Sequence, residues 1–268
     1  MESDLYKREY SLTEILSSAW KIFRDNAATI IAIMLMMGIP VALINLVAYQ
    51  ALMPSWINDS NTSSEEFATL FSENMDQLIS TFLMLGAIAI ITAFISLLSS
   101  IALAFYVKSC VDGKKISIST AYSRAFGRWP AAIYTNIVGG ILLILLFLII
   151  IIPGLIYSIY WTFALYAVAL SGKSGKQALD HSKSIVKNRW WTVLGYIFVF
   201  GLIGFVLAIP LVLIFGVFRW ALTDQLSGYA IDFTSNMLYL VIGSFIAVIQ
   251  VVFYLNFEST IKTDAKKY

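Results

Sequence analysis

The sequence predicts an all-α, polytopic membrane protein with six transmembrane helices and three amphipathic helices at the cytoplasmic interface. Of the 268 residues, 59% are hydrophobic and 13% are charged, whereas soluble domains are about 45–50% apolar and about 25% charged. The mean hydropathy is +0.81, and the apolar residues form long runs. In lipid such runs must satisfy their own backbone polar groups, so they are expected to be helices. We therefore expect a single integral membrane domain over residues 1–268.

The apolar runs define the six spans. They cover residues 28–52, 78–107, 131–152, 154–171, 190–217 and 236–257. A single helix over 131–171 would be about 60 Å long, twice the roughly 30 Å of a bilayer core. Pro153 and Gly154 lie between the third and fourth runs and favour a turn. These two runs are therefore predicted to form a tight helical hairpin with a short second arm.

The basic residues predict the orientation of the spans. In a six-span topology, all 18 Lys and Arg residues except Arg219 fall on one side. The 53–77 loop on the other side has no Lys or Arg but carries five acids. Since basic residues gather on the cytoplasmic side of membrane proteins, both termini are predicted to be cytoplasmic.

Three basic segments, 11–26, 117–130 and 174–191, have helical periodicity. In the last of these, one stripe is formed by Ala178, Leu179, Ser182, Ile185, Val186 and Trp190. Ser11 with Glu14, and Ser174 with Gln177, match the capping-box pattern at a helix start. Each segment precedes a pair of spans, so we expect each helix to lie in the cytoplasmic interface.

The second and third amphipathic segments also show a constant spacing. Ala121 and Ala178 are 57 residues apart, as are Pro153 and Pro210. This spacing favours three repeated units of an amphipathic helix and a helical hairpin, over residues 11–107, 114–171 and 172–258. The alternative is that the segments are ordinary amphipathic connectors of a polytopic protein.

The arrangement resembles a six-span family of bacterial and archaeal proteins named for the membrane domain of glycerophosphoryl diester phosphodiesterases. The resemblance is carried by Ile152-Pro153-Gly154, by Phe163-Ala164, and by GKSGKQALDHSKSIVKNRWWTVLG over residues 172–195. It covers about residues 10–258. The soluble phosphodiesterase domain of some members has no counterpart in these residues. The resemblance therefore implies a topology and a location in a prokaryotic inner membrane, but no established chemistry.

The pattern of polar residues does not favour an enzyme. His181 is the only histidine, and its place among lysines predicts an exposed interfacial residue. Phosphate-cradling glycine loops, zinc-ligand spacings and serine-nucleophile motifs are not found in the sequence. We expect no catalytic residue, cofactor, metal site or nucleic-acid partner.

Two functions remain open. The first is a module that binds anionic lipid headgroups or docks partner proteins, including another membrane protein or a second copy, at its cytoplasmic face. Its candidate residues are Arg124, Arg128, Lys176, Lys183, Lys187 and Arg189. The alternative is a transporter or permease subunit with a polar path between helices, since polar residues within spans often mark such paths. Its candidate residues are Asn136, Gln250, Asn256 and Glu258.

Overall fold

The computed structural model describes residues 5–54, 57, 63–222 and 225–264. Within these ranges the chain is helical and contains no strand. The helices are α2 (Leu12–Leu52), α3 (Ser64–Glu73), α4 (Met75–Val111), α5 (Ile118–Ile149), α6 (Ile151–Tyr160), α7 (Ala164–Ser171), α8 (Lys176–Val186), α9 (Trp190–Ala221) and α10 (Gln225–Asp264). Six stretches of these helices are long and apolar enough to cross a membrane. This confirms the predicted all-α membrane class.

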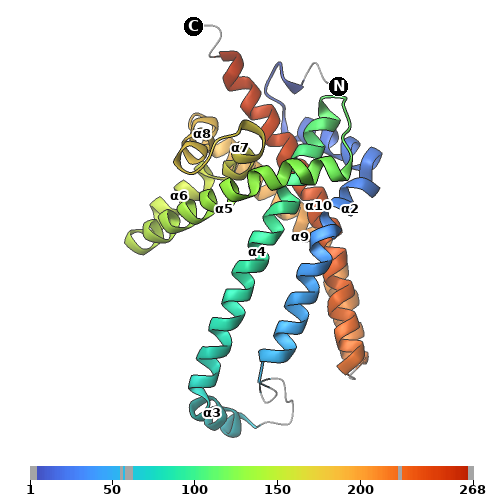
Figure 1. Cartoon of the computed structure of the whole chain (residues 1–268), viewed down its shortest axis with the longest axis vertical. Helices are drawn as coiled ribbons and strands as arrows, with labels where there is room; N and C mark the ends of the chain where they lie inside the picture. Colours follow the sequence, from blue (N-terminus) through green and yellow to red (C-terminus); the bar gives the residue numbers. More distant parts are fainter. Residues whose placement is uncertain (1–4, 55–56, 58–62, 223–224, 265–268) are drawn as a thin grey trace.

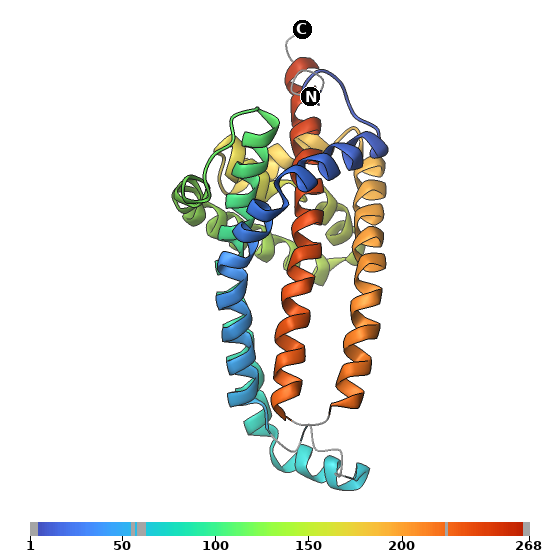
Figure 2. The same cartoon turned by 90° about the vertical axis from the view of Figure 1, so that its right-hand side faces the viewer.

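Four long helices, α2, α4, α9 and α10, run along the long axis of the molecule (Figures 1 and 2). Helix α10 packs against α2, α4 and α9. The largest buried side chains lie near the C-terminal end of α10, where Phe253 meets Phe163 with ring centroids 5.0 Å apart. In contrast, only 6% of the most apolar 18-residue stretch of α9 is buried inside the protein. Such exposed apolar surfaces are suited to contact with lipid chains.

Helix α2 contains both the first amphipathic segment and the first span. Ser11 and Glu14 form the predicted capping box, in which the Ser11 side chain accepts from the Glu14 N–H and Glu14 accepts from the Ser11 N–H. Asn26 has non-helical torsion angles (φ −141°, ψ 19°) and kinks the helix. The part before the kink crosses over one end of the long helices (Figure 2).

Helix α5 joins two elements that the sequence analysis placed apart. The amphipathic segment 117–130 and the span that starts at residue 131 form one continuous helix through Pro130. Proline removes a backbone hydrogen bond and usually interrupts a helix. Here Ala125 and Ala132, on either side of the proline, are fully buried in the core. The Trp129 indole N–H also donates to the carbonyl of Phe94 in α4 (2.8 Å), so contacts on both sides hold the two halves in line.

The predicted helical hairpin is present and is formed by the second half of α5 and by α6, but its turn is displaced. The chain turns at Ile150 (φ −153°, ψ 127°) and not at Pro153-Gly154. Pro153 is the third residue of α6, where an N–H has no helical partner in any case. A side chain at Gly154 would stand 2.6 Å from the Phe147 ring, so the glycine permits close packing of the two arms. The hairpin lies across the four long helices, not alongside them (Figures 1 and 2).

The second arm of the hairpin is broken, whereas one span over residues 154–171 was expected. Helix α6 ends at Tyr160 and α7 begins at Ala164. Ser182 of α8, which is fully buried, donates to the Tyr160 carbonyl (2.7 Å) and accepts from the Phe163 N–H (3.0 Å). A side chain from a later helix therefore binds the polar backbone groups that the break leaves open.

The start of α8 also differs from the prediction. Gly175, with φ +51°, is the N-terminal cap of α8, and no side-chain cap is present. The predicted capping box of Ser174 and Gln177 is therefore wrong. The Gly175 N–H donates to Thr135 Oγ1 of α5 (2.7 Å), so this turn is shaped by packing on α5. The apolar stripe of α8 is buried within the protein, as its residues Ala178, Leu179, Ser182, Ile185 and Val186 show.

The proposed repeat stays a prediction. Its two prolines occupy different settings, because Pro153 lies in the first turn of α6 and Pro210 lies inside the continuous helix α9.

Candidate functional site

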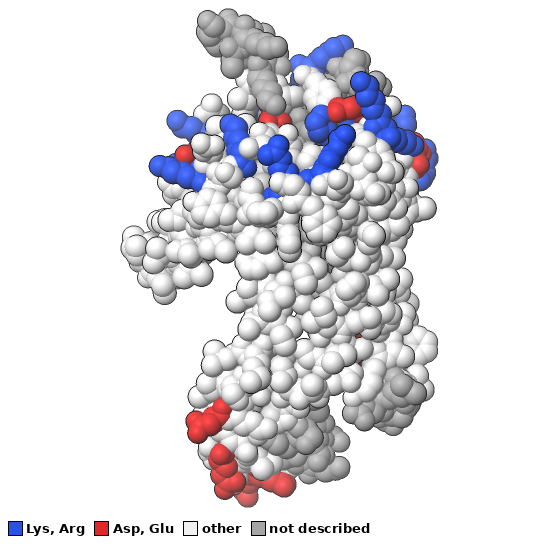
Figure 3. Space-filling model, viewed as in Figure 1, with Lys and Arg blue, Asp and Glu red and all other residues white. Residues whose placement is uncertain are grey.

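Charged side chains lie at opposite ends of the molecule with an apolar belt between them (Figure 3). On the face drawn in Figure 3, Lys and Arg side chains form a band at the end that carries α8 and the start of α5 (Figures 1 and 3), while Arg219, in the last turn of α9, pairs with Asp232 (2.8 Å). We call the end that carries this band the basic end. Acidic residues gather at the other end, where Glu65 and Glu66 lie in the first turn of α3 and Asp76 in that of α4. This separation matches the one inferred from the sequence.

Two of the six cations predicted to meet headgroups are engaged inside the protein. Lys183 donates to the Tyr157 hydroxyl (3.2 Å) and lies 4.8 Å from the centre of its ring. Arg189 donates to Glu9 (2.7 Å) and lies 4.7 Å from the centre of the Phe257 ring. Cation–π contacts and ion pairs of this kind stabilise packing between elements. These two residues are therefore structural.

The other four cations are exposed at the basic end. Arg124 and Arg128 lie one turn apart on α5, while Lys176 and Lys187 lie at opposite ends of α8. Their side chains make no hydrogen bond or ion pair with any residue that the structure describes. Since nothing within the described protein neutralises them, they are the cations of this set suited to bind an external anion.

Arg124 lines a cavity of about 240 Å³ at the basic end. Two further cations, Lys108 and Lys114, face the same cavity. Among the described residues, its acidic lining residue is Asp112, which pairs with Lys108 (2.5 Å) and accepts from the Tyr6 hydroxyl (2.7 Å). The cavity is thus lined by more positive than negative charge.

A second cluster of polar side chains joins α7, α8 and α10. Glu258, only 7% exposed, accepts from Ser171 (2.5 Å) and contacts His181 Nε2 (3.0 Å). The other ring nitrogen of His181 lies 3.0 Å from Lys173 Nζ, and Ser171 also bonds to Tyr254 (2.7 Å). A charged lysine can only donate, so His181 accepts at Nδ1 and donates from Nε2. The imidazole therefore links a cation to a buried carboxylate.

This second cluster serves packing between helices. Its hydrogen bonds connect α10 to Ser171 of α7 and to His181 of α8. Both residues are more than seventy residues away from Glu258 in the sequence. No group of three or more His, Cys, Asp or Glu residues that could hold a metal ion occurs in the described part of the chain.

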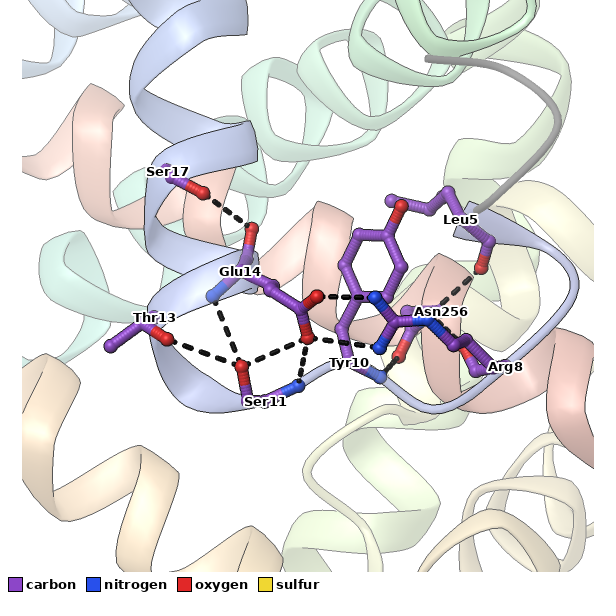
Figure 4. A network of polar contacts seen from close by, with 8 residues as sticks. All are labelled: Leu5, Arg8, Tyr10, Ser11, Thr13, Glu14, Ser17 and Asn256. Carbon is purple, nitrogen blue, oxygen red and sulfur yellow. Dashed lines mark hydrogen bonds and ion pairs between the residues drawn. The ribbon is translucent and has the colours of Figure 1, made fainter.

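Asn256 holds the N-terminal segment on α10 (Figure 4). Its amide donates to the carbonyls of Leu5 (2.7 Å) and Arg8 (2.9 Å), and its oxygen accepts from the Tyr10 N–H (2.9 Å). The side chain is fully buried. Arg8 in turn pairs with Glu14 of the α2 capping box (Figure 4). Asn256 is thus a clamp on the backbone of residues 5–10.

The remaining candidates for a transport path lie apart from this clamp. Asn136 is exposed and donates to the carbonyl of Ala132 in its own helix (2.9 Å). Gln250 is exposed as well and accepts from the Tyr166 hydroxyl (2.8 Å). Together with Asn256 and Glu258, each of the four side chains has a partner within the protein. The structure does not bring them together around one polar cavity.

Sequence reasoning missed the roles of Lys108, Lys114, Lys173 and His181. In the sequence, Lys108 and Lys114 contribute only to the count of basic residues that predicts the orientation of the spans. Gly113 between them is nevertheless a signal for the end of a helix, where both lysines would lie close together. His181 was expected to be exposed, but its side chain is only 13% exposed. Its partner Glu258 is 77 residues away, so no local pattern could have paired them.

One comparison with known proteins finds a match. The model of a domain of unknown function, DUF7847, matches residues 12–257. Neither the search of curated proteins nor the search of solved structures finds a match. The family match does not connect the chain to the phosphodiesterase membrane domains that it resembles, so that relationship stays a proposal. Since the match covers most of its length, the chain belongs to the DUF7847 family.

Proposed function

We propose that the protein is a non-enzymatic membrane module that binds anionic lipid headgroups at its basic end. The observation that carries the proposal is that four of the six candidate cations are exposed at that end and have no partner among the described residues, namely Arg124, Arg128, Lys176 and Lys187. Each Lys or Arg near an anionic membrane surface contributes about 1 kcal/mol of attraction. Four such residues beside an apolar belt suit the boundary between headgroups and acyl chains.

We propose further that the basic end is cytoplasmic and that the membrane is a prokaryotic inner membrane. The sorting of Lys and Arg supports the orientation, and the resemblance to the phosphodiesterase membrane domains supports the location. The transporter alternative has less support, because Asn136, Gln250, Asn256 and Glu258 are each engaged with other groups.

The test is the ratio of anionic to zwitterionic lipid that co-purifies with the protein. The variant replaces all four exposed cations by glutamine, and a matched control exchanges each Arg for Lys and each Lys for Arg, which keeps the charge. We expect the neutral variant to lose anionic lipid severalfold or more, since up to about 4 kcal/mol of attraction is removed before screening by salt. The charge-preserving control should retain most of it.

Topology must be the same in both variants, which thiol labelling of single cysteines can establish. An unchanged lipid ratio in the neutral variant would contradict the proposal. The exposed cations would then set orientation or dock a protein partner.

A further inference from the structure

We infer that the cavity beside Arg124 binds the phosphate group of one anionic lipid, with Lys114 and Arg124 as the contacting cations. This inference rests on the proposed function and assigns it a single site. The cavity lies between the C-terminal end of α4, the loop that follows it, the start of α5 and Leu170 of α7. Its volume of about 240 Å³ is below the usual 300–1,000 Å³ of pockets for drug-sized ligands. It suits a headgroup fragment, not a whole lipid.

The charges of the cavity leave two cations for a ligand. Asp112 uses both carboxylate oxygens within the protein, one on Lys108 and one on Tyr6. Lys108 is thus already paired. The side chains of Lys114 and Arg124 are exposed and have no hydrogen bond or ion pair within the described ranges. Arginine binds phosphate with two parallel N–H groups, and lysine adds a point charge.

The local backbone fixes the positions from which these two side chains extend. Gly113 follows the end of α4 and has a left-handed backbone conformation (φ +71°). The Lys114 N–H donates to the Ser109 carbonyl (2.9 Å), and the Gly113 N–H donates to the Cys110 carbonyl (3.3 Å). This pair of bonds is a Schellman motif, which fixes the chain after a helix. On the opposite wall, Ser117 caps α5 and Arg124 follows within the same helix. The backbone of the site is therefore fixed without a ligand.

The apolar part of the lining favours a lipid over a soluble phosphate. Phe105, Ile116 and Leu170 line the cavity alongside the cations. All three pack against the hydrophobic core and stay partly exposed. A ligand that fills this cavity meets both charge and apolar surface. An anionic phospholipid offers both, whereas inorganic phosphate offers only charge.

The test measures the affinity of the full chain for phosphatidylglycerol by native mass spectrometry. The variant is Lys114→Gln with Arg124→Gln. The matched control is Lys21→Gln with Arg24→Gln, which removes the same charge from exposed positions of α2 that neither line the cavity nor belong to the four candidate cations. We expect the cavity variant to bind phosphatidylglycerol roughly thirty-fold more weakly, from about 1 kcal/mol for each cation. The control should change the affinity by less than about threefold, because exposed charges away from the site are screened.

Three outcomes separate this inference from the proposed function. Equal weakening in both variants would contradict the cavity site but keep anionic lipid binding at the basic end. No weakening in the cavity variant would overturn the cavity site, and the variant that lacks the four exposed cations then decides whether anionic lipid binds elsewhere at the basic end. The last measurement is competition by inorganic phosphate for the bound lipid. If inorganic phosphate displaces phosphatidylglycerol at millimolar concentration or below, the cavity binds soluble phosphate and the lipid assignment is wrong. Arg124→Lys, which keeps the charge but not the paired N–H groups, should weaken binding less than the double variant.

Discussion

The clamp formed by Asn256 gives the sharpest prediction from the structure. Replacing Asn256 by leucine, of similar size, removes three hydrogen bonds to the backbone of Leu5, Arg8 and Tyr10. A hydrogen bond contributes about 1 kcal/mol net to stability, so attachment of the segment should weaken by about 3 kcal/mol. At 1.4 kcal/mol for each factor of ten, this raises the detached population roughly 100-fold.

Limited trypsin digestion measures this population. Cleavage after Lys7 or Arg8 requires the segment to leave α10, and its rate follows the detached population when reattachment is fast. Intact-mass measurement of the loss of the N-terminal residues gives the rate. The matched control is Asn136→Leu, because Asn136 is exposed and bonds only within its own helix.

We expect the Asn256 variant to be cleaved about 100-fold faster than the wild type, and the Asn136 variant to be cleaved at the wild-type rate. Cleavage of the Asn256 variant within threefold of the wild type would refute the clamp. Equal acceleration in both variants would show that the loss of any span asparagine loosens the segment, which also contradicts the argument.

Three further predictions concern topology and packing. In a background without the native cysteine, an impermeant thiol reagent applied to intact cells should label Ser63→Cys but not Ser184→Cys, and the reverse pattern would overturn the orientation. Ile150→Cys, at the apolar tip of the α5–α6 hairpin, should stay unlabelled from either side of the membrane, since a thiol in hydrocarbon does not ionise; rapid labelling would place the tip in water. Glu258→Ala should destabilise the protein by about 3–6 kcal/mol, because its hydrogen bonds with Ser171 and His181 are lost and each bond to a charged group contributes about 1.5–3 kcal/mol, whereas Asp180→Ala at an exposed position should change stability by less than about 0.5 kcal/mol. Thermal unfolding of the two variants in one detergent tests the difference.

The helices were predictable from the sequence because they depend on local patterns. Long apolar runs identify segments that must be helical in lipid, and the six stretches apolar enough to cross a membrane overlap the six predicted runs, although the fourth is divided into α6 and α7. The capping box of Ser11 and Glu14 is also local, since its partners are three residues apart. These features need no knowledge of the rest of the fold.

The failures arose where distant residues decide the local structure. Ser174 has the same capping pattern as Ser11, but a hydrogen bond from Gly175 to Thr135 of α5 moves the start of α8. The break between α6 and α7 is likewise held by Ser182 of a later helix. Hydropathy does not contain this information.

The candidate site was predictable only in its general character. The sequence placed the cations at one end, but it could not separate Arg124, which faces a cavity, from Lys183 and Arg189, which are engaged by aromatic rings. All three have the same appearance in a periodic pattern, because basic residues on an amphipathic helix are alike in sequence. The structure distinguishes them, because Tyr157 of α6 contacts Lys183 and Phe257 of α10 contacts Arg189.

The most direct test of anionic lipid binding at the basic end is a density map of the protein in a phosphatidylglycerol bilayer. The account predicts ordered phosphate density between Lys114 and Arg124, with the acyl chains following the apolar belt. It also predicts that the tip of the α5–α6 hairpin lies within the hydrocarbon region. An empty cavity, with ordered lipid absent from the whole basic end, would contradict the account.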